Sequence, residues 1–180
     1  MDVSQAIKTR RSIRKYKQEA VPHEVIEQIV ADAAYAPSWK NTQIARYLLV
    51  EDRAAIDKMA EEMVLDFKFN EKTLKNCAAL MVLTYITGRS GFERDGSYAT
   101  PKEAGFEMFD AGIAAQTFCL AAWERGVGTV ITGYFDEEKI IELLKLPEDR
   151  KIGCVIGLGY PDEEPAVPKR KSVSDLLTYQ

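Results

Sequence analysis

Four cationic side chains and two small hydroxyl residues crowd into eight positions near the start of the chain, in the stretch TRRSIRKY from Thr9 to Tyr16. Arginine donates paired hydrogen bonds to phosphate oxygens, and a serine beside it adds a hydroxyl and a backbone N–H. Such a run can equally be an ordinary solvated surface. The whole chain has a net charge of −4, which argues against nucleic acid or an anionic membrane as the partner. The stretch therefore favours a single phosphate group.

A second basic cluster lies near the other end, in VPKRKS, where Lys169, Arg170 and Lys171 are consecutive. Alone, this cluster carries no more information than any charged tail. In an acidic chain, the two clusters together indicate that the N-terminal and C-terminal segments meet around one phosphate.

Two further stretches could contact a flat, polar ligand. In APSWKNTQ, from Ala36 to Gln43, a rigid proline is followed by short hydroxyl and amide side chains, although a plain helix-terminating loop has the same composition. In GTVITGYF, a strand runs into Gly133, where the absence of a side chain allows a ligand to approach the backbone.

Most familiar catalytic motifs are missing. The chain has one histidine and three cysteines, and Cys77, Cys119 and Cys154 lie far apart in apolar runs, so we expect them to be reduced and buried. The GLGYP stretch has two of the three glycines of a dinucleotide fingerprint and is followed by proline and acidic residues. The sequence therefore predicts no metal site, no nucleophile of its own and no Rossmann unit.

Apolar periodicity and turn signals predict a single α+β or three-layer domain over residues 1–180. We expect helices over 3–8, 22–36, 53–67, 106–125 and 136–144, strands over 46–50, 78–86, 129–132 and 152–158, and a loop over 87–105. The tail, about 161–180, has little of its own to pack on and should wrap on this subunit or a neighbour. Without a signal peptide or a membrane span, a cytoplasmic protein is expected.

Taken together, the order R-R-S-x-R, A-P-S-x-x-N-x-Q, an Ala-rich helix leading to G-x-G-T, L-G-Y-P and a basic tail resembles the FMN-dependent nitroreductase family. The similarity runs from Val3 to about Leu177. It implies a nitroreductase-like three-layer α/β/α fold with a mixed central sheet, and an intertwined homodimer with one FMN at each of two subunit interfaces. The tail would then wrap on the dimer.

The resemblance also implies which residues contact the FMN. Arg10, Arg11, Ser12, Lys169 and Arg170 match the phosphate end. Arg14 matches the basic residue near the pyrimidine edge of the flavin, where reduced flavin carries negative charge.

The flavin ring has its own matching residues. Pro37, Ser38 and Trp39 resemble the stretch that reaches FMN from the opposite subunit, and Asn41 and Gln43 match contacts to the ring and ribityl chain. The segment Ile131, Thr132 and Gly133 matches the one that faces the ring. Gln43 is followed by Ile44 and Ala45 where the family commonly has Pro-Trp, which should change the packing behind the flavin.

The implied activity is hydride transfer from NAD(P)H, a transient reductant, through FMN to a nitroaromatic, a quinone or a similar small-molecule acceptor. No catalytic side chain is required, because the cofactor carries the chemistry. The loop 87–105, with Phe92 and Tyr98, and Trp39 are expected to form the walls of the substrate pocket. Two alternatives stay open: dehalogenation or flavin fragmentation on the same fold, and a non-enzymatic module that binds a phosphate-bearing ligand.

Overall fold

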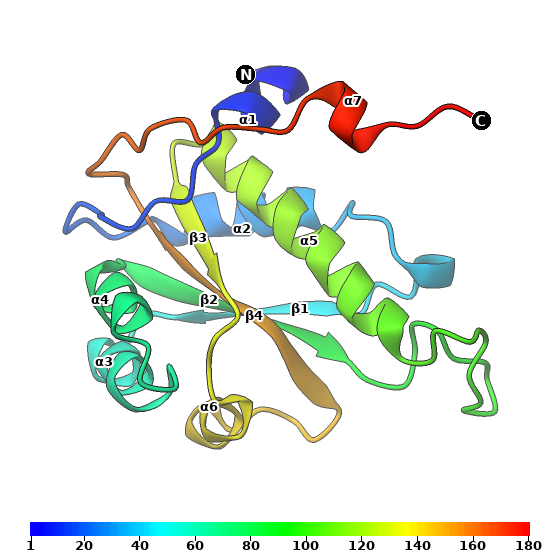
Figure 1. Ribbon diagram of the computed structural model, residues 1–180. Helices are drawn as coiled ribbons and strands as arrows, with labels where there is room; N and C mark the ends of the chain where they lie inside the picture. Colours follow the sequence, from blue (N-terminus) through cyan, green and yellow to red (C-terminus); the bar gives the residue numbers. More distant parts are fainter.

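A four-stranded sheet forms the middle of the computed structural model, which describes residues 1–180. Its strands are β1 (Ala45–Val50), β2 (Ala79–Ile86), β3 (Gly128–Thr132) and β4 (Arg150–Gly159), in the order β1-β2-β4-β3 (Figure 1). Each neighbouring pair is antiparallel. The sheet is mixed only through an isolated parallel bridge between Ser12 and Thr129. The four strands expected from the sequence are confirmed, with their ends shifted by one or two residues.

Helices cover both faces of the sheet. The buried side chains of α2 (His23–Ala33) and α5 (Gly105–Glu124) pack on one face, and those of α3 (Arg53–Glu62), α4 (Lys68–Asn76) and α6 (Glu137–Leu144) pack on the other (Figure 1). Two short helices, α1 (Val3–Thr9) and α7 (Val173–Leu176), lie in the terminal segments. The predicted three-layer arrangement is confirmed.

Strand β2 is buried along its whole length because it faces a helical layer on each side. Successive side chains of a strand point to opposite faces, and accordingly Met81 and Leu83 pack against α2 and α5, while Leu80 and Val82 pack against α3 and α4. Helix α5 contributes Phe118 to this core, fully buried. The hydrophobic layers therefore leave polar groups mainly at the two edges of the sheet.

The segment 53–76 differs from the sequence expectation. One helix was predicted over 53–67, but α3 ends at Glu62 and a second helix, α4, begins at Lys68. The chain reverses through Leu65 and Asp66, both with positive φ (49° and 58°). Neither residue is a glycine or proline, so the sequence carries no signal for this turn.

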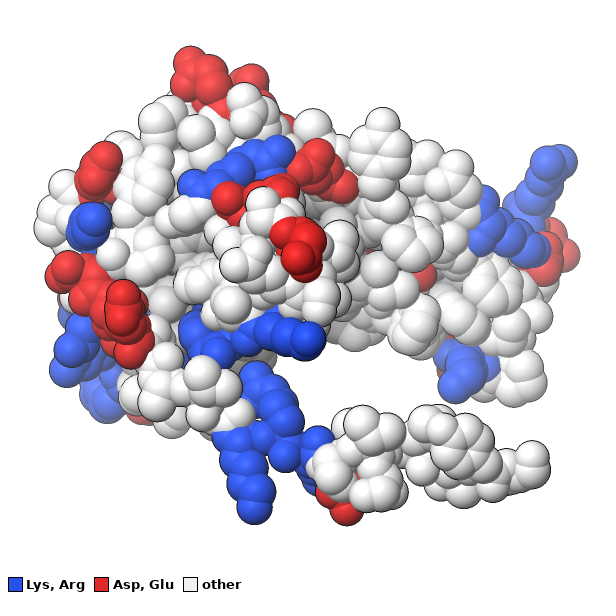
Figure 2. Space-filling model, turned by 90° about the horizontal axis from the view of Figure 1, so that it is seen from above, with Lys and Arg blue, Asp and Glu red and all other residues white.

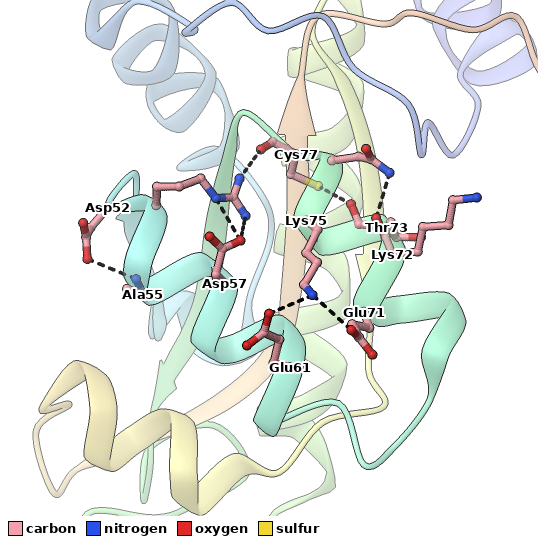
Figure 3. A network of polar contacts seen from close by, with 11 residues as sticks. Asp52, Ala55, Asp57, Glu61, Glu71, Lys72, Thr73, Lys75 and Cys77 are labelled. Atoms are coloured by element: carbon pink, nitrogen blue, oxygen red, sulfur yellow. Dashed lines mark hydrogen bonds and ion pairs between the residues drawn. The ribbon is translucent and has the colours of Figure 1, made fainter.

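Polar contacts hold α3 and α4 together (Figure 3). Lys75 on α4 lies 2.8 Å from Glu61 on α3 and 3.1 Å from Glu71. Arg53 pairs with Asp57 at 2.7 Å and donates to the Cys77 carbonyl at 3.2 Å (Figure 3). These exposed pairs add little stability individually, and of the ion pairs only the one between Lys75 and Glu61 joins the two helices.

Local signals located the starts of α1 and α6 correctly. Asp2 accepts a hydrogen bond from the Gln5 N–H (2.8 Å), and Asp136 accepts one from the Lys139 N–H (3.2 Å), as N-cap residues do.

The three cysteines are free and buried, as expected, and burial raises the pKa of Cys77 to about 12.

After β4 the chain first follows the N-terminal segment, to which Pro161 and Glu163 are joined, and then leaves the body. Beyond Pro165 each side chain is exposed, and the end of the tail stands clear of the body in Figure 2, with lysine and arginine side chains on both sides of the place where it departs. None of the helices is both long and apolar enough to cross a membrane.

Gly157 of β4 is closely packed against Cys77 and the neighbouring strand β3. A Cβ at this position would overlap the Cys77 sulfur and approach Val130 Cγ1 to 3.2 Å. We expect Gly157→Ala to lower the free energy of unfolding by about 1–3 kcal/mol through overpacking, measured by urea denaturation. Gly105→Ala is the control, because a Cβ there would come no closer than 3.8 Å to Lys102; equal stability of both variants would contradict this reading.

Candidate functional site

The basic stretch near the N-terminus lies along the outer edge of β3. Ser12 forms a parallel bridge with Thr129, and the Ile13 N–H donates to the Thr129 carbonyl at 3.0 Å. Further along, Glu163 Oε1 accepts from the backbone N–H groups of Arg14 (2.6 Å) and Lys15 (3.1 Å). The segment is therefore held between β3 and the chain that follows β4.

Beyond this bridge the edge of β3 is open. The Thr129 carbonyl points outward, away from β4, and the alternation of a strand directs the backbone groups of Ile131 and Gly133 the same way. The Ile131 side chain is 46% exposed, whereas Thr132 is buried and donates to the Val155 carbonyl at 2.9 Å. No atom lies within 4 Å of where a Cβ of Gly133 would stand. A flat ligand can reach this backbone.

The arginines beside this edge lack acidic partners. Arg10, Arg11 and Arg14 are half-buried, and none of them takes part in the ion pairs of the structure. Arg11 Nη1 donates to the carbonyls of Lys8 and Arg10, both at 2.8 Å. A cluster of guanidinium groups that form no ion pair is suited to an anionic ligand.

Three exposed aromatic side chains stand next to Arg14, and the sequence reading missed them. The Arg14 guanidinium lies 5.3 Å from the centre of the Phe69 ring. Phe67 packs on Phe69 at 6.0 Å and edge-on against Tyr134 at 5.5 Å between ring centres. Phe67 and Phe69 lie at the start of α4. Because one helix was predicted over 53–67, neither this second helix start nor its two aromatic side chains were recognised in the sequence. The signal that could have found them is the F-K-F pattern followed by the polar Asn70.

The loop Ala36–Gln43 forms a second group of predicted residues. It contains a 3₁₀ turn, Trp39–Asn41, and the positive φ angles of Lys40 (43°), Asn41 (55°) and Gln43 (49°). Left-handed backbone at residues other than glycine is strained and is concentrated at ligand-binding sites. The Gln43 N–H donates to Ser38 Oγ at 2.9 Å, which closes the loop.

A pocket of about 550 Å³ opens between this loop, the end of α2, β1 and α5. Pro37, Ser38 and Gln43 line it together with Tyr47 and Asp110. Two buried polar atoms in this region have no hydrogen-bond partner, Trp39 Nε1 and the Tyr47 hydroxyl, and burial raises the pKa of Tyr47 to about 12. Unsatisfied donors beside a pocket are what a polar ligand would satisfy.

The two groups do not meet within one chain. The β3 edge carries Arg10, Arg11, Ser12, Arg14, Ile131, Thr132 and Gly133, and the loop at the β1 side carries Pro37, Ser38, Trp39, Asn41 and Gln43. Strands β2 and β4 separate β1 from β3, which at about 4.8 Å per strand is roughly 14 Å. The open edge of β3 also points away from β1.

The tail residues join neither group. Lys169 and Arg170 are exposed, and the one side-chain hydrogen bond of Arg170 is local, to the Pro168 carbonyl at 3.2 Å. The meeting of the two basic clusters around one phosphate therefore stays a prediction.

Phe92 and Tyr98 lie away from both groups. Their rings pack on each other at 5.0 Å, beside a hollow of about 680 Å³ that contains none of the predicted cofactor residues. Trp39 packs on Phe106 at 4.3 Å between ring centres. Phe67, Phe69 and Tyr134 form the aromatic group beside Arg14, and the role of Phe92, Tyr98 and Trp39 as walls of a substrate pocket stays a prediction.

The arrangement can bind an anionic, flat ligand but offers no nucleophile. No cluster of histidine, cysteine and acidic side chains could hold a metal ion, and burial raises the pKa of Cys77 and Cys154 to about 12. The sole histidine, His23, is exposed and contacts Glu51 at 2.7 Å. Chemistry at this site has to come from what it binds.

Comparison with known proteins agrees with this geometry. A relative from Bacillus subtilis (strain 168), provisionally named NAD(P)H nitroreductase YfhC, is 30% identical over 96% of this chain and 91% of its own. One from Methanothermobacter thermautotrophicus, provisionally named NADH dehydrogenase/NAD(P)H nitroreductase, is 34% identical over 92% and 80%. Iodotyrosine deiodinase of Thermotoga neapolitana is 25% identical over 96% of each chain.

Solved structures show the same fold. A nitroreductase family protein from Clostridium novyi NT superposes with a TM-score of 0.77 at 27% identity, covering 93% of this chain and 90% of its own. A nitroreductase-like protein from Exiguobacterium sibiricum 255-15, in complex with FMN, has a TM-score of 0.83 at 21% identity and covers 100% and 98%. The model of the family described as "Nitroreductase family" matches residues 7–160. The chain belongs to the nitroreductase family.

Proposed function

We propose that the protein is an FMN-dependent oxidoreductase that passes hydride from NAD(P)H to a nitroaromatic, a quinone or a related small-molecule acceptor. The observation that carries the proposal is the row of half-buried arginines without carboxylate partners beside the open edge of β3. Relatives named as NAD(P)H nitroreductases and the FMN complex of the Exiguobacterium sibiricum protein support it.

The residues present fit FMN. Its phosphate needs several donors, which Arg10, Arg11 and Ser12 supply, and its flat ring needs an open surface, which Ile131 and Gly133 supply. Bound FMN would accept and release two electrons. The chain's own task is to hold the phosphate, present backbone N–H groups to the ring and exclude water from one of its faces.

Arg14 is the residue we assign to the electronic properties of the flavin. Reduced flavin carries negative charge near its pyrimidine edge, and a fixed guanidinium there stabilises that charge. The contact with the Phe69 ring and the backbone bond to Glu163 restrict where the Arg14 side chain can go. The aromatic residues Phe67, Phe69 and Tyr134 would then form a wall against which a flat acceptor packs.

The placement of the two groups supports a homodimer. The loop Ala36–Gln43 cannot reach the β3 edge of its own chain, so we propose that it completes the FMN site of a second copy. The exposed tail, with Lys169 and Arg170, would wrap on that copy and bring its charges to the phosphate. Two equivalent FMN sites per dimer result, and the proposed location stays the cytoplasm.

Dehalogenation is a second candidate, favoured by the full-length similarity to the deiodinase of Thermotoga neapolitana. Both reactions would use the same FMN site and differ in the acceptor. Oxidation of the reduced enzyme by a panel of a quinone, a nitroaromatic and an iodophenol separates them, because the physiological class should react fastest. A protein that binds phosphate-bearing ligands but transfers no hydride would contradict both.

The phosphate site is tested by two arginine variants. We expect purified protein to be yellow, and Arg10→Ala or Arg170→Ala to weaken FMN binding by about 1.5–3 kcal/mol, the loss of hydrogen bonds to a charged group. Titration with FMN gives the dissociation constant. Arg150→Ala is the control, since Arg150 pairs with Asp149 beside the other hollow. Unchanged affinity in both test variants would exclude the two-ended site, and a colourless protein that takes up no FMN would exclude the proposal.

The role of Arg14 is tested by the flavin midpoint potential. Arg14→Gln removes the positive charge near the ring, so the potential should fall by roughly 30–60 mV, the equivalent of about 1.5–3 kcal/mol for two electrons. Spectroelectrochemistry of the FMN-loaded protein measures this shift. Lys15→Gln, at the exposed neighbouring position, should leave the potential nearly unchanged; an equal shift in both variants would show that only the overall charge matters.

A further inference from the structure

A buried carboxylate on the central helix receives hydrogen bonds from the loop Ala36–Gln43. Asp110 of α5 is 4% exposed, and its Oδ2 lies 2.9 Å from the Trp39 backbone nitrogen and 2.6 Å from Ser90 Oγ. Ser90, fully buried, lies 2.6 Å from Thr42 Oγ1. No ion pair neutralises Asp110, so backbone and hydroxyl donors alone stabilise it.

The direction of these bonds can be worked out. A carboxylate only accepts hydrogen bonds, so Ser90 must donate its proton to Asp110. The Ser90 oxygen is then left to accept, and Thr42 must be the donor to it. Two donors from the loop, Trp39 N–H directly and Thr42 O–H through Ser90, therefore converge on one oxygen of Asp110.

This convergence matters because the loop is strained. Lys40, Asn41 and Gln43 have left-handed backbone, a conformation that persists only when surrounding contacts enforce it. The hydrogen bonds that lead to Asp110 hold the loop at Trp39 and Thr42, which flank Lys40 and Asn41. Asp110 also lines the 550 Å³ pocket together with Pro37 and Ser38.

We propose that Asp110 is a positioning residue that holds this loop in the shape required by the FMN site of the partner copy. The inference rests on the proposed function and assigns a role to a residue that reaches FMN only through the loop. The effect of Asp110 would appear at the FMN site of the other subunit, because the loop lies beside β1 and the two edge strands β1 and β3 are at opposite edges of the sheet.

The first experiment compares Asp110→Asn and Ser90→Ala with a matched control, Glu107→Gln. Glu107 lies on the same helix, is 5% exposed and accepts the Gly88 N–H at 2.6 Å, but does not contact the loop. We expect the FMN dissociation constant to rise roughly tenfold in Asp110→Asn and roughly threefold in Ser90→Ala, and to stay within about twofold in Glu107→Gln. Hydrogen exchange of the peptide covering 36–43, without FMN, should accelerate in the first two variants only.

The second experiment tests whether the effect crosses between subunits. Chains carrying Arg10→Ala and Asp110→Asn are co-expressed with different tags, and mixed dimers are purified over both tags. If the loop acts on the partner, both lesions fall in one site and the other site is intact, so each mixed dimer should bind one FMN with wild-type affinity. If the loop acts on its own chain, each site has one lesion and no wild-type site exists.

Three results would overturn the inference. If Asp110→Asn binds FMN with wild-type affinity, Asp110 does not position the loop. If the mixed dimer has no site of wild-type affinity, the loop does not act on the partner subunit. If Asp110→Asn does not fold, Ser90→Ala decides in both experiments, because it breaks the Thr42 branch while leaving the carboxylate in place. If the wild-type protein takes up no FMN, the proposed function itself is wrong, and this inference, which rests on it, is wrong as well.

Discussion

Burial of the central strands on both faces is the constraint that distributes the polar groups of this protein. Strand β2 is buried along its length between two helical layers, and a polar side chain there would lose its hydration without compensation. Ligand-binding groups are therefore confined to the sheet's edges, to the loops beside β1 and to the outer edge of β3. A site that needs both edges cannot be completed by one copy of such a sheet.

The two edges differ in their chemistry. The β3 edge combines a backbone surface with guanidinium groups that form no ion pair, in a chain whose net charge is −4. The β1 side combines strained backbone, an apolar pocket and unsatisfied donors on Trp39 and Tyr47. The β3 edge suits the phosphate and the electron-rich ring of a flavin. The β1 side suits a face of the ligand that is to be enclosed and kept free of water. A ligand placed between two copies would satisfy both.

Local physical chemistry made much of the fold predictable from the sequence. Capping by Asp2 and Asp136 depends on residues three positions away, and the β2 run is apolar because both of its faces are covered. The turn at Leu65 and Asp66 was missed because no glycine or proline marks it, and a leucine gives no signal for left-handed backbone. The aromatic group of Phe67, Phe69 and Tyr134 was missed with it. Of the candidate site, the basic stretch and the loop could be found by residue type, whereas their separation across the sheet follows only from the strand order.

Asp110 illustrates what no local pattern reveals. The residues next to it on α5 are apolar or small, and the sequence pattern does not distinguish Asp110 from Glu107, the other buried carboxylate of this helix. The reason for the charge lies 71 residues away at Trp39 and 20 away at Ser90. Removing a buried carboxylate while its hydrogen-bond donors stay in place is costly, because those donors are then buried without an acceptor. Keeping this charge in the core lets two donors of a strained loop converge on one carboxylate oxygen, which is the physical basis of the role proposed for Asp110.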